Sequence, residues 1–189
     1  GLVGSEMCIR DRYYHEIVEE IQGLADGQQC DVRILQAVLF SMYSMPPSCN
    51  CSCFAFTTEQ EILLGRNSDF LTEIERLNQN VVYKLTDGVY SFTGNTTAFV
   101  EIEDGVNEHG LAVGLTSVYP YQCKPGFNAG MIVRYLLEKC RNVSEAVSCL
   151  YQLPIASAQT LTLADTMGAI AVIELSLIHI SEPTRPEPI

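Results

Sequence analysis

Two short runs of alternating apolar and small residues, separated by four polar ones, place the strongest constraint on the fold. Residues 51–57 ("CSCFAFT") and 62–66 ("ILLGR") have the composition of β-strands, and the polar residues 58–61 ("TEQE") lie between them. A turn centred on residues 59–60 would join the strands as a hairpin. The pattern therefore predicts that "GRNSDF" (65–70) returns to the neighbourhood of Cys51.

This turn would place Cys53 opposite Arg66 and Cys51 opposite Ser68, and a loop one residue longer would shift each pair by one position. A cationic neighbour favours the thiolate form of cysteine, which is the nucleophilic form. Asn67 and Asp69 add an amide and a carboxylate to the same neighbourhood. The alternative is an arginine–aspartate pair at a strand end, with thiols that serve as small apolar residues.

The two ends of the chain are related through one short DNA sequence. A DNA string that encodes Leu175 to Arg185 encodes Leu2 to Asp11 on its opposite strand. The string resembles a sequencing adapter, so we expect residues 1–12 and 175–189 to be foreign flanks. The natural part would then be residues 13–174, without its true start or end.

Composition excludes several classes of partner. The net charge of −12 and the lack of a basic run argue against nucleic acid or an anionic membrane surface. No apolar run reaches the length of about 18 residues that a membrane span needs. Seven of the eight cysteines lie outside the flanks, and their odd number and irregular spacing favour a reduced, cytoplasmic protein.

Periodicity predicts an α+β fold with antiparallel sheet. Two helices should precede Cys51, the second capped by Asp31 and ended by Pro46 and Pro47. Helices are expected near 129–140 and from an Asn142-x-x-Glu145 capping box to Leu153. The further strands are expected at 81–85, 98–102, 111–118, 160–164 and 169–174.

Several motifs together resemble a known family. "CSCFAF" (51–56) followed by "GRNSDF" (65–70) is similar to the start of the mature chain in cysteine Ntn hydrolases, in the choloylglycine hydrolase and acyl-CoA:penicillin (isopenicillin N) acyltransferase-like group. "DGVNEHGLAVGLTSV" (104–118) resembles a second hairpin of that group. A third match is upstream, where residues 16–27 resemble the helical leader of acyltransferase-like members, and a fourth, weaker match is the hairpin at 161–174.

The resemblance implies the four-layer αββα sandwich of Ntn hydrolases, truncated on its C-terminal side. Residues 13–50 would be a helical leader or propeptide, and residues 51–174 the N-terminal part of the hydrolase domain. Family members continue well beyond this point, so we expect the chain as written to lack sheet partners and to be inactive.

The resemblance also implies an activity for the intact protein. The leader would be removed autocatalytically between Asn50 and Cys51, and the freed α-amino group, with a pKa of about 7.7–8.0, would act as general base for the thiol. Cys51 would then cleave a linear, non-peptide C–N amide bond through an acyl-enzyme. Water, or an acyl-acceptor amine, would complete the reaction. The implied partners are a small-molecule amide substrate and an acyl-acceptor amine or acyl-CoA. The resemblance implies no cofactor.

Other residues are assigned by matching the family's motifs. Arg66 and Asp69 match a pair that supports the nucleophile and its amine. Thr116 occupies an oxyanion position where relatives often carry asparagine or tyrosine, and a hydroxyl is its only side-chain donor. Asn67 is a second candidate for the oxyanion or the substrate.

A different class of function is a non-catalytic α+β module with a structural or metal-binding cysteine cluster. Cys49, Cys51 and Cys53 would share one face of a regular strand. Their C-x-C-x-C spacing lacks the C-x₂₋₄-C loop of zinc sites, so we expect no metal. Cys53, together with Cys140 and Cys149, is interpreted as core packing. Asn107 is expected to tolerate a left-handed backbone within a polar turn at 104–110.

Overall fold

The computed structural model describes residues 12–42, 50–69, 71–86, 88–118, 123–175 and 180–181. Its helices are α2 (His15–Gln28), α3 (Val32–Ser41), α4 (Ala129–Lys139) and α5 (Val143–Leu150), with a 3₁₀ helix η1 (Thr72–Leu77). Its strands are β1 (Asn50–Thr57), β2 (Ile62–Asp69), β3 (Gln79–Tyr83), β4 (Phe92–Thr96), β5 (Asp104–Asn107), β6 (Ala112–Ser117), β7 (Gln159–Ala164), β8 (Ile170–Leu175) and β9 (Ile180–Ser181).

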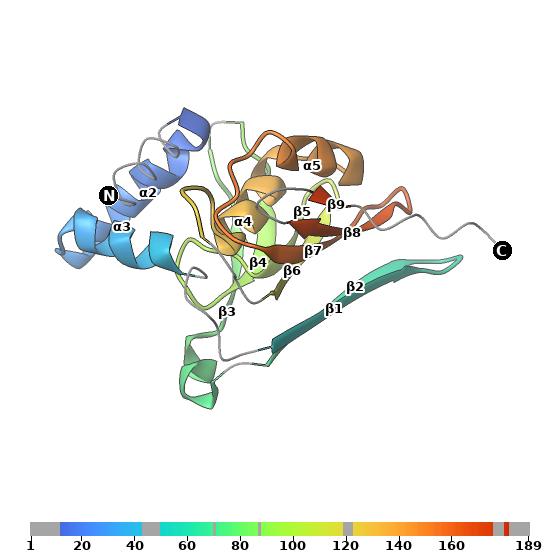
Figure 1. The fold of residues 1–189 in the computed structure, drawn as a ribbon, viewed down its shortest axis with the longest axis horizontal. Helices are drawn as coiled ribbons and strands as arrows, with labels where there is room; N and C mark the ends of the chain where they lie inside the picture. The colour runs from blue at the N-terminus through green and yellow to red at the C-terminus, as the bar shows by residue number, and fades with distance from the viewer. Residues whose placement is uncertain are drawn as a thin grey trace.

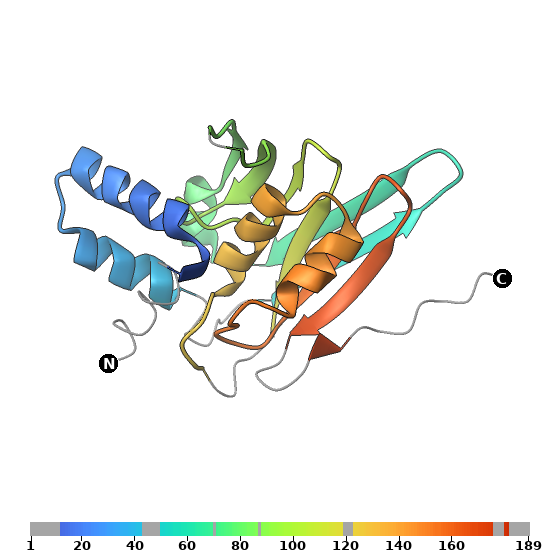
Figure 2. The same ribbon diagram turned by 90° about the horizontal axis from the view of Figure 1, so that it is seen from above.

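The strands form two antiparallel sheets that lie face to face. Strands β3 to β9 make a seven-stranded sheet in chain order, and β1 and β2 make a separate hairpin. The hairpin lies against one face of the large sheet, over β6 and β7 (Figure 1). Helices α4 and α5 cover the opposite face (Figure 2). The prediction of an α+β sandwich with antiparallel sheets is therefore confirmed, and the described residues form helical, large-sheet and hairpin layers.

The core lies between the large sheet and α4. Alternate residues of β6 and β7 point toward the helix and are buried, including Val113, Leu115, Leu161 and Leu163. The intervening residues of these strands point toward the hairpin. One of them is Gly114, where an added Cβ would lie 2.7 Å from the sulfur of Cys53. The hairpin can approach the sheet because position 114 has no side chain.

Two helix caps agree with the sequence. The Asp31 side chain accepts a hydrogen bond from the backbone N–H of Arg33 at the start of α3. The Asn142 side chain accepts from the N–H of Glu145 at the start of α5. Pro46 and Pro47 lie outside the described residues, and α3 ends before them at Ser41.

The prediction of a strand at 98–102 is wrong. The chain turns there instead, with a single bridge between Ala98 and Glu101 and a left-handed backbone at Phe99 (φ 57°). The Thr96 hydroxyl accepts the N–H of Ala98 at 3.0 Å and stabilises the turn. The strand in this region is β4, which precedes the turn.

The predicted polar turn at 104–110 is also shorter than expected, because residues 104–107 form β5. Asn107 is buried and does not adopt a left-handed backbone. Its amide nitrogen donates to the carbonyls of Leu137 and Cys140, while its amide oxygen accepts the N–H groups of His109 and Leu111. Asn107 therefore joins the end of α4 to the β5–β6 turn, and the left-handed residue of the turn is Gly110.

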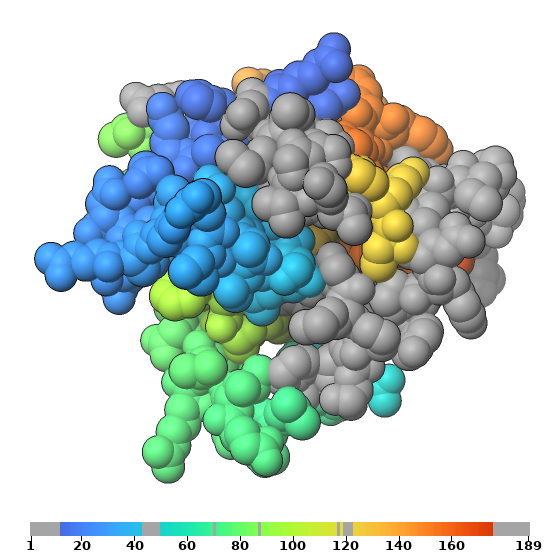
Figure 3. Space-filling view, turned by 60° about the vertical axis from the view of Figure 1, so that its left-hand side comes forward, coloured from blue at the N-terminus to red at the C-terminus, as the bar shows by residue number. Residues whose placement is uncertain are grey.

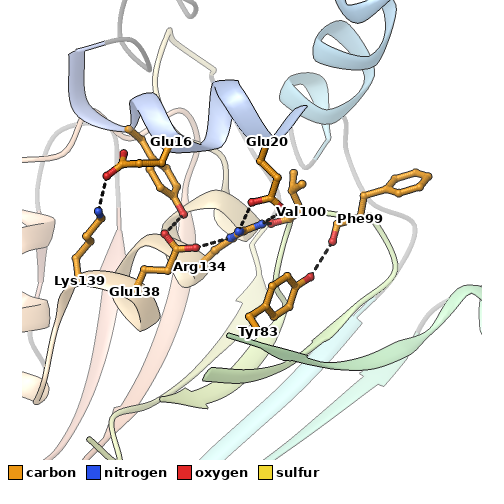
Figure 4. Close-up of polar contacts among 9 residues, drawn as sticks. Glu16, Glu20, Tyr83, Phe99, Val100, Arg134, Glu138 and Lys139 are labelled. Carbon is orange, nitrogen blue, oxygen red and sulfur yellow. Dashed lines mark hydrogen bonds and ion pairs between the residues drawn. The ribbon is translucent and has the colours of Figure 1, made fainter. Parts of the chain in front are cut away.

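The helices α2 and α3 lie together on one face, with η1 and β3 below them in the view of Figure 3. A buried polar network attaches α2 to α4 (Figure 4). Arg134 donates to Glu138 at 2.7 Å, to Glu20 at 2.5 Å and to the carbonyl of Val100 at 3.1 Å. The hydroxyl of Tyr14 donates to Glu138 at 2.5 Å. In the described part of the chain, no helix is both long and apolar enough to cross a membrane.

Replacing Tyr14 with phenylalanine should lower the free energy of unfolding by about 2 kcal/mol, because the buried Glu138 carboxylate loses a donor. Urea unfolding followed by circular dichroism measures the change. Tyr13→Phe is the matched control, since Tyr13 is exposed. Equal effects of the two substitutions would contradict a role for the buried hydroxyl.

Gly114→Ala should destabilise the protein by about 1–3 kcal/mol, because its methyl group would overlap the Cys53 sulfur. Adding Cys53→Ala should recover part of that loss in a urea-unfolding series. Gly23→Ala, in open space on α2, is the control and should not destabilise. A double variant no more stable than Gly114→Ala alone would show that the sulfur is not the obstacle.

Candidate active site

The hairpin has the register that the sequence predicted. Cys51 pairs with Ser68, and Cys53 pairs with Arg66. Thr58 and Glu61 close the turn through an N–H to carbonyl hydrogen bond of 2.8 Å. Opposite residues of an antiparallel pair project to the same side, so all four side chains face the large sheet.

Arg66 links this hairpin to the large sheet. Its side chain is only 4% exposed. Nη2 donates to the sulfur of Cys51 at 3.3 Å, and Nε donates to the carbonyl of Leu115 on β6 at 2.7 Å. The expected proximity of the arginine and the Cys51 thiol is thus present in the structure.

Two carboxylates that the sequence analysis did not select complete the surroundings of Arg66. Nη1 donates to Glu103 Oε2 and to Asp104 Oδ2, each at 3.1 Å. Thr97 donates to the other oxygen of Glu103 at 2.8 Å and fixes its orientation. The only sequence signal was the acidic run "EIED" at 101–104, which gives no indication of a partner on β2.

Burial and charge oppose each other in this cluster. Burial by itself would lower the pKa of Arg66, but the charges of Glu103, Cys51 and Asp104 outweigh it and raise the pKa above its usual value. Burial raises the pKa of Asp104, while Arg66 counteracts that effect. The Arg66 guanidinium is thus held between the Cys51 sulfur and two carboxylates.

The neighbouring thiol of Cys53 lies in a different environment. Burial raises its pKa, and a hydrogen bond with Thr162 only partly offsets this effect. Its sulfur packs close to Gly114 on β6. These contacts agree with the interpretation of Cys53 as a packing residue.

Asp69 and Asn67 lie on the other face of the hairpin. Asn67 donates to the Asp69 carboxylate at 2.5 Å, and both side chains are exposed. Asp69 is the pairing partner of Asn50, the residue that precedes Cys51. The structure thus places Asp69 next to the backbone on the N-terminal side of Cys51, while Arg66 contacts the thiol.

Thr116 lies on the hairpin-facing side of β6, two residues beyond Gly114. Its hydroxyl donates to the carbonyl of Thr160 at 3.4 Å. Its assignment to an oxyanion site stays a prediction, because that role would require the hydroxyl to turn from this carbonyl toward a substrate.

No group of three or more histidine, cysteine, aspartate or glutamate side chains in the described ranges is arranged to hold a metal ion. Cys49, which a three-cysteine site would need, lies outside those ranges.

Comparisons with known proteins place this geometry in context. The family model described as acyl-coenzyme A:6-aminopenicillanic acid acyl-transferase matches residues 56–188. This range includes Arg66, Asp69 and Thr116, and it begins after Cys51. It also includes residues 175–188, so the assignment of that end to a foreign flank stays a prediction.

Among solved structures, the chain is similar to penicillin V acylase from Agrobacterium tumefaciens, at 19% sequence identity and a TM-score of 0.45. The similarity covers 71% of this chain and 49% of the acylase, so the chain spans about half the length of that protein. No curated protein matches the sequence.

Glu103→Gln should accelerate alkylation of Cys51 by iodoacetamide at neutral pH by roughly tenfold, because the Arg66 guanidinium loses one of its two carboxylate partners and becomes more available to the Cys51 sulfur. Mass spectrometry of the Cys51 peptide measures the rate. The control is Glu73→Gln, which makes the same substitution on η1, a helix that contributes none of the Arg66 contacts described above. An unchanged or slower rate in Glu103→Gln would contradict this account of the electrostatics.

Proposed function

Because this chain belongs to the acyl-coenzyme A:6-aminopenicillanic acid acyl-transferase family, we propose that the intact protein is an Ntn-type acyltransferase or amidohydrolase with Cys51 as its nucleophile. The observation that carries this proposal is the hydrogen bond from the buried Arg66 guanidinium to the Cys51 sulfur. A thiol beside a fixed cation is suited to covalent catalysis.

The proposed reaction begins with attack of the Cys51 sulfur on an acyl carbonyl. The thiol proton passes to the free α-amino group of Cys51 and then to the leaving group, leaving a thioester on the enzyme. Attack by an amine would transfer the acyl group, and attack by water would release an acid. Either second step regenerates the thiol.

The α-amino group must first be released from its peptide bond with Asn50. In the structure Asn50 is the first residue of β1 and pairs with Asp69, so the site is described in its uncleaved form. We place the cleavage between Asn50 and Cys51. Asp69, on the Asn50 side of the hairpin, would then orient the new amine, while Arg66 remains on the thiol.

The description of the matching family supports two kinds of substrate, an acyl donor and an acyl acceptor. It names acyl-coenzyme A and 6-aminopenicillanic acid, an acyl donor and an acceptor amine. We propose a linear amide or acyl thioester as donor, with an amine or water as acceptor. Thr116 and Asn67 are the proposed donors to the oxyanion or substrate. Thr116 would have to release the carbonyl of Thr160 to act, and Asn67 would have to contact substrate from the face of the hairpin opposite the Cys51 thiol.

Intact-mass measurement of the complete protein tests the proposal. Wild type should separate into two chains between Asn50 and Cys51, Cys51→Ala should stay whole, and Cys53→Ala should still be cleaved because Cys53 only packs. Processed wild type should also acquire the mass of an acyl group when mixed with an acyl donor.

The result that contradicts the proposal is an uncleaved wild type in which Cys51 is alkylated no faster than Cys53. The cysteine cluster would then be structural, and zinc analysis of the complete protein would test the remaining alternative, a metal site that includes Cys49.

A further inference from the structure

A second pair of cysteines lies in the helical layer, on the side of the large sheet opposite Cys51. Cys140 caps the C-terminus of α4, and Cys149 lies in the last turn of α5. Both are reduced in the structure. The proposed reaction at Cys51 uses neither of them.

The two thiols contact each other and are not equivalent. A hydrogen bond joins their side chains; it lowers the pKa of Cys149, although burial opposes this effect. The same hydrogen bond, followed by burial, raises the pKa of Cys140. These directions favour the thiolate form at Cys149 rather than at Cys140.

The two thiols also differ in their exposure to solvent. Cys140 is 3% exposed, whereas Cys149 is partly exposed. A surface cavity of about 390 Å³ is lined by both cysteines, together with Tyr135, Lys139, Ser144 and Gln152. Cys149 is the partly exposed thiol of this cavity, whereas Cys140 belongs to the buried core.

We propose that Cys149 and Cys140 form a thiol–disulfide exchange site for low-molecular-weight disulfides of the glutathione class, with Cys149 as the attacking thiol and Cys140 as the resolving thiol. The thiolate of Cys149 attacks one sulfur of the small disulfide, forms a mixed disulfide and releases one thiolate, which takes up a proton. Cys140 then loses its proton and attacks the Cys149 sulfur, and the second small thiol leaves. The two protein thiols are oxidised to a disulfide, and the small disulfide is reduced to two thiols.

The position of the pair gives this bond a structural consequence. Cys140 directly follows the helix that carries Arg134 and Glu138, the residues that attach α2. The carbonyl of Cys140 also accepts a hydrogen bond from Asn107 at the β5–β6 turn. A disulfide would join α5 covalently to the point where the helical layer meets the large sheet.

The test is incubation of the full chain with oxidised glutathione, rapid alkylation of remaining thiols, and peptide mapping without reduction. Wild type should give a peptide pair linked through Cys140 and Cys149. Cys140→Ala should instead accumulate a glutathione adduct on Cys149, because no resolving thiol remains. In Cys149→Ser the remaining thiol, Cys140, should also be tested. Its glutathione adduct should form to an extent at least tenfold lower than the adduct on Cys149 in Cys140→Ala.

Cys30 is the control within the same chain, because it is exposed and lies in the connection between α2 and α3. It should acquire glutathione at a similar rate in all variants. Modified Cys30 without a Cys140–Cys149 link in wild type would overturn the proposal, and so would equal modification of Cys140 when Cys149 is replaced. Because the readout is a mass and not an activity, neither result depends on the reaction proposed for Cys51.

Discussion

The arrangement of the two sheets depends on one buried guanidinium. Arg66 leaves β2, donates to a carbonyl of β6 and to carboxylates beside and within β5, and still reaches the sulfur of Cys51. A buried charge is costly unless its hydrogen-bonding capacity is satisfied. The hairpin is therefore held where these acceptors converge, and the position of Cys51 follows from that restraint.

A second buried arginine has a comparable role on the other side of the large sheet. Arg134 joins α4 to Glu20 of α2 and to the carbonyl of Val100, and Tyr14 contacts the same network through Glu138 (Figure 4). Helix α2 is thus attached by buried polar contacts as well as by apolar packing. If the chain is cut before Cys51, these contacts do not depend on the broken peptide bond.

The local features predicted from sequence agree with the structure where their causes are local. The hairpin register follows from a short turn and alternating side chains, and the caps at Asp31 and Asn142 follow from side chains that bond within their own turns. The errors occur where tertiary contacts prevail. Residues 98–102 have strand-like composition but form a turn. The Asn107 side chain donates hydrogen bonds to carbonyls at the end of α4, which are distant in the sequence.

The sequence by itself determined that Cys51 and Arg66 lie on one hairpin, because antiparallel pairing across a short turn follows from residues close together in the chain. Only the tertiary structure decided which groups surround them. Glu103 and Asp104 are 37 and 38 positions from Arg66, and Leu115 is 49 positions away. Packing of one sheet on the other brings these groups together, and strand periodicity alone does not specify the alignment of two packed sheets.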